Sequence, residues 1–173
     1  GVVSMAKRHV GQPVSVKMRS GLSENLPYLL DFVQAMEESG ADWMTLHPRI
    51  QPQGRRGRAA WEAIARARDV VGIPVVGNGD VQTAEDVLAM RCETGCDAVM
   101  VARAATARPW IFWQLGEALG FAPPAGREGE AAPRSPEDEG REYGRALLFF
   151  LDQIERWFTV EEGLRRVRFF VAW

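Results

Sequence analysis

The sequence predicts an α/β fold, namely the C-terminal half of a (β/α)8 barrel (TIM barrel), followed by a small all-α helical region. Two short apolar runs, residues 73–77 and 97–101, flank a segment with an apolar helical face over 83–93. This is the pattern of a βαβ unit with buried parallel strands. The four expected strands begin at Val14, Asp42, Pro74 and Asp97. Their spacings of 28, 32 and 23 residues compare with about 30 per unit of a complete barrel. An open doubly wound sheet is the competing interpretation of this periodicity.

The other elements follow from local signals along the chain. Residues 7–10 are expected to end a helix, because Gly11 and then Pro13 come directly after them. Residues 14–19 alternate as a strand, and a helical apolar pattern runs from 23 or 25 to 39, where Gly40 ends it. A second strand is expected at 41–46. Two further helices are expected at 61–71 and 110–119.

The predicted domain organisation has three parts. Residues 1–119 form the half barrel, residues 120–136 are a linker rich in glycine and proline, and residues 137–173 form the helical region with two helices. The chain begins without methionine and stops inside an amphipathic pattern. We therefore expect a piece of a longer protein that lacks the N-terminal half of the barrel, and expect this piece alone to be inactive and marginally stable or self-associating.

Composition narrows the function classes. The formal net charge is −2, so contact with nucleic acid has to come from local basic patches rather than from the whole surface. The two cysteines, Cys92 and Cys96, are too few for a disulfide framework or a zinc site, and both are expected to be small packed side chains. No apolar run approaches the ~20 residues of a membrane span. We expect a cytoplasmic protein with no metal.

Polar side chains follow each expected strand, where a barrel gathers its functional groups. They are Lys17 and Arg19, His47 and Arg49, Asn78 and Asp80, and Arg103. Each alone is explained as a solvated charge, a structural histidine or a tight turn. Together they suggest a binding site for a phosphorylated, electron-rich heterocycle: backbone amides at Gly79 and around Ala102 would cradle the phosphate, and the cationic donors would lie near the ring.

Several separated motifs resemble the tRNA-dihydrouridine synthase family. They are Val16-Lys17-Met18-Arg19, then Leu46-His47-Pro48-Arg49 with Gln53, Gly57, Ala59 and Trp61, then residues 73–80 ending in Asn78-Gly79-Asp80, then residues 94–104, and then Pro109-Trp110-Ile111-Phe112. The resemblance covers residues 13–114 and resumes weakly at 163–173. It implies flavin-dependent reduction of tRNA uridine to 5,6-dihydrouridine, with FMN as cofactor and NADPH as reductant.

The resemblance also implies roles for individual residues. Lys17 and His47 would contact the flavin ring, and Arg19 and Arg49 would face the substrate uridine. The ribityl phosphate would be held by Asn78, Gly79, Asp80, Ala102 and Arg103. No catalytic residue is assigned, because the cysteine with which the family protonates uridine is expected outside this chain.

Two departures and two basic clusters complete the prediction. Pro48 and Ala102 stand where the family has glycine, so one backbone N–H is lost and one less permissive backbone is introduced. Contacts with tRNA are expected at Arg55, Arg56 and Arg58, and at Arg165, Arg166 and Arg168.

Two alternative functions stay open for the chain. One is another FMN-dependent barrel oxidoreductase acting on a small molecule, and the other is a non-catalytic RNA-binding fragment.

Overall fold

The computed structural model describes residues 1–172, and contacts within it define two compact units. The first consists of residues 1–81 and 85–101, and the second of residues 82–84 and 102 onward. The helices of the predicted half barrel that follow its last strand therefore group with the C-terminal helices. Each unit is described by itself below.

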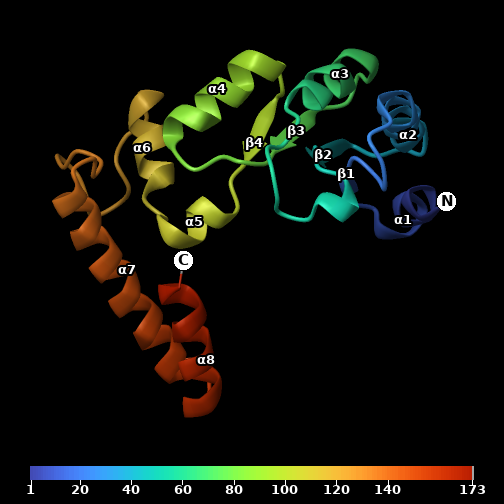
Figure 1. The fold of residues 1–173 in the computed structure, drawn as a ribbon. Helices are drawn as coiled ribbons and strands as arrows, with labels where there is room; N and C mark the ends of the chain where they lie inside the picture. Colours follow the sequence, from blue (N-terminus) through green and yellow to red (C-terminus); the bar gives the residue numbers. More distant parts are fainter. Residues whose placement is uncertain (173) are drawn as a thin grey trace. The chain divides into compact units, whose positions relative to one another are not determined.

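The first unit is a four-stranded parallel sheet with helices between the strands (Figure 1). The strands are β1 (Ser15–Arg19), β2 (Trp43–His47), β3 (Val75–Asn78) and β4 (Ala98–Met100), and they lie side by side in sequence order. The helices are α1 (Val2–Val10), α2 (Leu26–Glu38), the short 3-10 helix η1 (Gln51–Gln53), α3 (Glu62–Val70) and α4 (Ala84–Thr94). Strand order that follows chain order, with parallel pairing throughout, confirms the consecutive β/α units predicted from the spacing.

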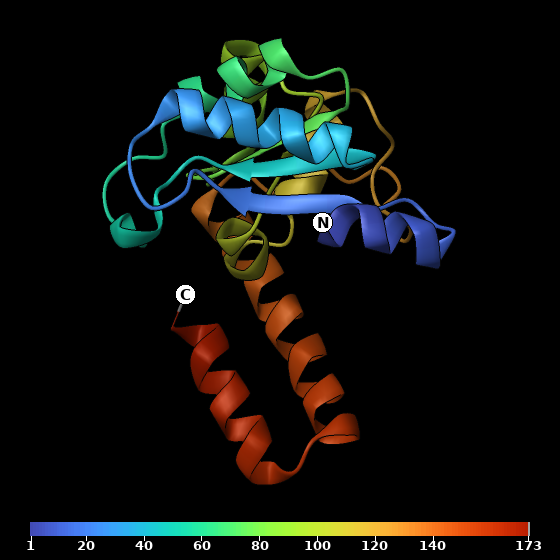
Figure 2. The ribbon, with the colours of Figure 1, turned by 90° about the vertical axis from the view of Figure 1, so that its right-hand side faces the viewer.

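Helices α2, α3 and α4 all lie on the same side of the sheet (Figure 2). The strand residues that point to this side include Met44, Leu46 and Val75, and all three are fully buried. Gly77 lies on the same face, where an added Cβ would come within 2.7 Å of the Met90 sulfur. The core therefore lies between the sheet and these helices, and Gly77 lets α4 approach the sheet closely.

Local signals set the helix ends where the sequence placed them. Gly11 follows α1 with a φ of 61°, in the left-handed region that favours glycine. The Asn25 side chain accepts a hydrogen bond from the Tyr28 amide at 3.0 Å, which caps α2. Strand β2 starts at Trp43 rather than at residue 41, and Asp42 before it bonds to Val14 through both its backbone amide, at 2.8 Å, and its Oδ2, which accepts from the Val14 amide at 2.5 Å.

Aspartates brace the amino ends of the strands in a repeated arrangement. Asp42 accepts the Val14 amide and pairs with Lys7 at 2.7 Å, and these contacts hold the pKa of Asp42 below its ordinary value, the Lys7 hydrogen bond being the largest cause. Asp97 likewise accepts the Val75 amide at 2.8 Å. The two aspartates lie two strands apart, so this end of the sheet is built for stability.

The second unit contains α5 (Arg103–Ala107), α6 (Ile111–Ala118), α7 (Pro136–Trp157) and α8 (Val160–Val171). Residues 120–135 form no helix or strand, as predicted for the linker, but they are anchored. Arg127 pairs with Glu142 of α7 at 2.5 Å and lies over the Trp113 ring of α6. The Gln114 side chain donates to the Pro133 carbonyl. The two helices predicted after the linker are present, and Trp173 lies outside the described residues.

Helices α7 and α8 form a hairpin, and a glycine of α8 lies at the contact between the two helices. Thr159 begins α8 with a capping box, in which its side chain and that of Glu162 bond to each other's backbone amides. Gly163 is buried, and a Cβ added there would lie 2.5 Å from Cγ2 of Ile154, one of the few buried side chains of α7. The hairpin therefore depends on the absence of a side chain at Gly163.

We expect Gly163→Ala to lower the free energy of unfolding by about 1–3 kcal/mol, because the added methyl overpacks the contact with Ile154. Gly140→Ala is the matched control, because that helical glycine is exposed and has open space around it. It should gain up to about 1 kcal/mol from helix propensity. Urea unfolding followed by circular dichroism compares the two, and a stabilised Gly163→Ala variant would contradict the packing described.

Candidate functional site at the carboxyl ends of the strands

The strand register brings the predicted site residues of the first unit together. Arg19 is paired with His47, and Asn78 with Met100. The pairing of Leu46 with Gly77 places His47 next to Asn78 at the following position. Side chains of paired residues in neighbouring strands point to the same face. Arg19, His47 and Asn78 therefore form one row at the carboxyl ends, on the face opposite α2, α3 and α4.

Lys17 lies on the same face, one row further from the carboxyl ends. Its register partners are Thr45 of β2 and, through Thr45, Val76 of β3. The Lys17 side chain is exposed, whereas Thr45 is buried. In a barrel this face is the interior, so Lys17 lies below the row that Arg19 and His47 begin.

Arg49 and Asp80 form an ion pair that joins the loops after β2 and β3. Arg49 Nη2 lies 2.5 Å from Asp80 Oδ1, and the Arg49 side chain is only 3% exposed. The same nitrogen donates to the Gly57 carbonyl at 2.6 Å, and the other carboxylate oxygen of Asp80 accepts from the Ala59 amide at 2.6 Å. Arg49 was predicted to face the substrate, and its burial and internal partners do not support that role.

Gly79 lies between this ion pair and His47. A Cβ at Gly79 would lie 2.9 Å from the Ala59 Cβ and 3.1 Å from His47 Cδ2, and its φ of 123° also disfavours any side chain. Its carbonyl accepts a hydrogen bond from the Trp61 indole at 2.9 Å. Gly79 is therefore required for the close packing of the two loops.

Arg19 holds the loop that follows β2. Its Nε donates to the Arg49 carbonyl at 3.1 Å, and its Nη2 donates to the carbonyls of Ile50 and Gly54 at 3.0 and 2.7 Å. Within the same loop, the Gln53 amide donates to the carbonyls of Arg56 and Arg58. Arg19 and Gln53 thus hold the backbone of the loop after β2 in place, a structural role that their spacing in the sequence did not reveal.

The surroundings of His47 favour the neutral form of its imidazole. Partial burial lowers the pKa of His47 below its ordinary value of 6.5, and the positive charges of Arg19, Arg49 and Lys17 lower it further, against a smaller opposite effect of Asp80. The charges that act on this histidine are thus three cations and one carboxylate. Cationic side chains gathered in this way favour an anionic ligand.

The remaining predicted residues are placed as follows. Asn78 is buried, and its Nδ2 donates to the Met100 carbonyl at 2.7 Å, so it ties β3 to β4. Ala102 and Arg103 belong to the second unit and begin α5. Ala102 has a φ of −120°, outside the left-handed region, so alanine is accommodated where the family has glycine. The phosphate-binding roles of these residues stay predictions.

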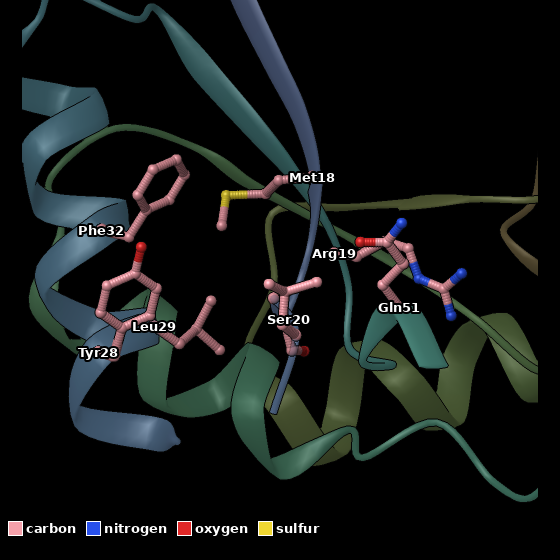
Figure 3. A pocket seen from close by; sticks show the side chains of 9 residues that line it. Met18, Arg19, Ser20, Tyr28, Leu29, Phe32 and Gln51 are labelled. Atoms are coloured by element: carbon pink, nitrogen blue, oxygen red, sulfur yellow. The ribbon is translucent and has the colours of Figure 1, made fainter. Parts of the chain in front are cut away.

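The first unit has pockets beside the carboxyl end of β1. One, of about 310 Å³, is an apolar recess between α2 and the edge strand β1, where Tyr28, Leu29 and Phe32 extend from the helix toward Met18 (Figure 3). A second, of about 300 Å³, lies at the carboxyl ends of β1 and β2, and its lining includes Ser20, Pro48 and Arg58. Both pockets include residues that follow β1 and residues that follow β2.

The residues that the structure describes contain neither a metal-ligand cluster nor a membrane-spanning helix. Residues 1–172 contain no cluster of three or more histidine, cysteine or acidic side chains that could hold a metal ion. No described helix has the length and apolar character needed to cross a membrane. Cys96 is buried as predicted, whereas Cys92 is exposed, so the prediction that Cys92 is packed was wrong: it falls on the solvent side of α4.

A parallel β/α sheet whose strands follow chain order, with polar side chains at their carboxyl ends, is the arrangement of part of a (β/α)8 barrel. Residues 1–169 match the family model described as dihydrouridine synthase (Dus). The chain belongs to the dihydrouridine synthase family.

Curated relatives agree with this assignment. A "Probable tRNA-dihydrouridine synthase" of Mycobacterium leprae is 36% identical over 93% of this chain and 40% of that protein, and one of Mycobacterium tuberculosis is 38% identical over 93% and 39%. The "tRNA-dihydrouridine synthase B" of Pseudomonas aeruginosa is 30% identical over 99% and 49%. The chain thus spans two fifths to one half of these relatives. A mandelate oxidase crystal structure matches 68% of this chain and 49% of its own at 15% identity, with a TM-score of 0.48.

We expect Asp80→Asn to lower the free energy of unfolding by about 3 kcal/mol, because it leaves the buried Arg49 guanidinium without its counter-charge. Asparagine tolerates the left-handed backbone of Asp80, whose φ is 55°. Its single carbonyl oxygen can accept from Arg49 or from the Ala59 amide but not from both, so the change removes the charge together with one acceptor. Asp152→Asn, which breaks an exposed ion pair with Arg156, should cost less than about 1 kcal/mol. Equal losses in urea unfolding would contradict the importance of the buried pair.

The lowered pKa of His47 predicts a pH dependence of stability. As pH falls through the ordinary value of 6.5, the unfolded chain binds a proton at His47 while the folded chain resists it. The unfolded state then binds more protons, so stability falls with pH in this window. Between pH ~7.5 and ~5.5 the wild type should lose stability faster than His47→Gln. Parallel profiles for the two chains in denaturant unfolding would contradict the shift.

Proposed function

We propose that the protein acts in the reduction of tRNA uridine to 5,6-dihydrouridine, with FMN as its cofactor and NADPH as the reductant. The observation that carries the proposal is the row of Arg19, His47 and Asn78 at the carboxyl ends of the strands, with Lys17 below it on the same face. Family membership and the names of the curated relatives support the same reaction.

The residues of the first unit fit FMN. Its phosphate and its reduced ring are both anionic, and three cationic side chains face a single carboxylate around His47. The absence of a side chain at Gly79 keeps the loop backbone close to His47. Lys17 would supply a positive charge beside the ring and neutral His47 a hydrogen bond. When bound, FMN would supply the hydride for C6 of the uracil.

The proposed phosphate ligands are Asn78, Gly79, Asp80, Ala102 and Arg103, and their roles rest on the family resemblance. Among them the Asp80 carboxylate is occupied by Arg49 and by the Ala59 amide, so its contribution would come from the backbone. Arg19 remains a proposed neighbour of the substrate. Its bonds to the loop after β2 would keep its charge at the rim of the site.

The proposed tRNA contacts are two clusters of exposed arginines. Arg55, Arg56 and Arg58 lie in the loop anchored by Arg19, and all three are exposed. Arg165, Arg166 and Arg168 are exposed on α8. Exposed arginines on a surface loop and along a helix are suited to contact phosphates. The target uridine would have to leave its stack to lie against the flavin ring.

Protonation of the uridine needs a general acid, and neither cysteine of the chain is positioned for that role. Cys92 is exposed near the end of α4, and Cys96 is buried before the amino end of β4. Both are therefore at the opposite end of their strand or helix from the carboxyl-end row. We propose that the family's cysteine is supplied from outside these residues, in a cytoplasmic enzyme longer than this chain.

FMN binding is the first test. After FMN is added to the purified chain and the excess is removed, visible absorbance should show retained flavin. Lys17→Ala and Arg103→Ala should each reduce the retained amount about tenfold or more, since a charged hydrogen bond is lost. Arg141→Ala, an exposed arginine of α7 paired within its own helix, should leave it unchanged.

Two outcomes would count against the proposal. Flavin retained equally by both variants would place the flavin away from Lys17 and Arg103. No retention, even in a chimaera that supplies the additional length of the mycobacterial relative, would reject FMN as the cofactor of this chain.

A further inference from the structure

Arg49 makes a contact with His47 that constrains the protonation of the ring. Arg49 Nη1 lies 3.3 Å from His47 Nε2. A guanidinium has only donors, so Nε2 has to accept and cannot carry a proton. In a neutral imidazole the proton then resides on Nδ1. The Arg49 contact therefore selects one of the two neutral tautomers of His47.

The packing of the His47 ring leaves its Nδ1 nitrogen available for a hydrogen bond to a ligand. The Cδ2–Nε2 edge of His47 faces Gly79, since a Cβ there would lie 3.1 Å from Cδ2 and 3.3 Å from Nε2. Nδ1 lies across the ring from that edge. Within residues 1–172, no hydrogen bond is made to Nδ1 of His47. Its N–H is thus a donor without a protein acceptor.

Arg49 is itself held too firmly to move with the ligand. Its guanidinium is 3% exposed and is fixed by Asp80 Oδ1 and the Gly57 carbonyl. It is thus nearly sealed from solvent, while His47 above it is only half-buried. The charged groups that surround the imidazole are Arg19, Arg49, Lys17 and Asp80. Of these, Arg49 is the one that bonds to the ring.

We propose that Arg49 is a positioning residue, which fixes His47 as the neutral Nδ1–H tautomer and so presents a neutral N–H donor to an acceptor atom of the bound ligand. The identity of that ligand as a flavin rests on the proposed function. The tautomer itself does not, because it is set by contacts within the chain. Arg49 therefore acts through His47, with Asp80 holding it in place.

Nitrogen-15 NMR of the wild-type chain tests the proposal directly. The chain has two histidines, so a spectrum of the histidine-labelled protein is assigned with the single variant His9→Gln. At a pH where His47 is neutral, its Nδ1 should show the shift of a protonated nitrogen and its Nε2 that of an unprotonated one. The reverse pattern, or an even mixture, in the wild type would overturn the proposal whether or not any variant folds.

Variants then assign the effect to Arg49. Arg49→Lys keeps a positive charge near Asp80 but loses the fork that reaches both Asp80 and His47, so the Nδ1–H form should give way to a tautomer mixture. Arg49→Met with Asp80→Asn removes both charges together, so that no unpaired charge is left buried. Arg68→Lys, at the amino ends beside Asp97, is the control and should leave the His47 pattern unchanged. A folded Arg49 variant that keeps the wild-type pattern would overturn the proposal.

Adding FMN separates this proposal from the assignment of the flavin. If both hold, FMN shifts the Nδ1–H signal of the wild type, and Arg49→Lys weakens FMN binding about tenfold through the misplaced donor. A wild-type chain with the expected tautomer and no response to FMN supports the positioning role and counts against the flavin. A wild-type chain with the proton on Nε2 that still binds FMN supports the flavin and counts against the positioning role.

Discussion

The ion pair between Arg49 and Asp80 is the constraint on which the carboxyl end of the sheet depends. A guanidinium that is 3% exposed is tolerated only with a counter-charge, and the chain has to bring a carboxylate from 31 residues away to supply it. To do so, Asp80 adopts a left-handed backbone and Gly79 packs against Ala59 without a side chain. The loops after β2 and β3 therefore form one connected structure, and His47 is held between them.

The two ends of the sheet use aspartates in opposite ways. At the amino ends, Asp42 accepts the amide of Val14, directly before β1, and Asp97 accepts the first amide of β3. Both aspartates also pair with a cation, Asp42 with Lys7 and Asp97 with Arg68. At the carboxyl ends a single aspartate faces Lys17, Arg19 and Arg49. The aspartates at the amino ends are thus paired one to one with cations, whereas at the carboxyl ends three cations act on His47 against one carboxylate.

The sequence was sufficient for the strands, because apolar runs with polar tips and near-regular spacing depend on local pattern alone. It also placed Lys17, His47 and Gly79 on or directly after neighbouring strands, as the register shows, while their proposed roles stay predictions. It could not show that Arg49 is buried, because the partner that permits burial, Asp80, is distant in sequence and a turn aspartate looks the same whether or not it is paired. The exposure of Cys92 was missed for a similar reason: the side of α4 that a residue occupies depends on what the helix packs against.

The departures from the family pattern are explained by the same packing. Pro48 is buried, and its carbonyl accepts the Ala60 amide at 3.0 Å, so the residue serves the loop through its acceptor and needs no N–H. Ala102 keeps an ordinary negative φ, so a glycine is not needed there. Neither change alters the charge around His47. The cations Lys17, Arg19 and Arg49 around His47 are therefore unaffected by these two residues, and they continue to favour its neutral imidazole.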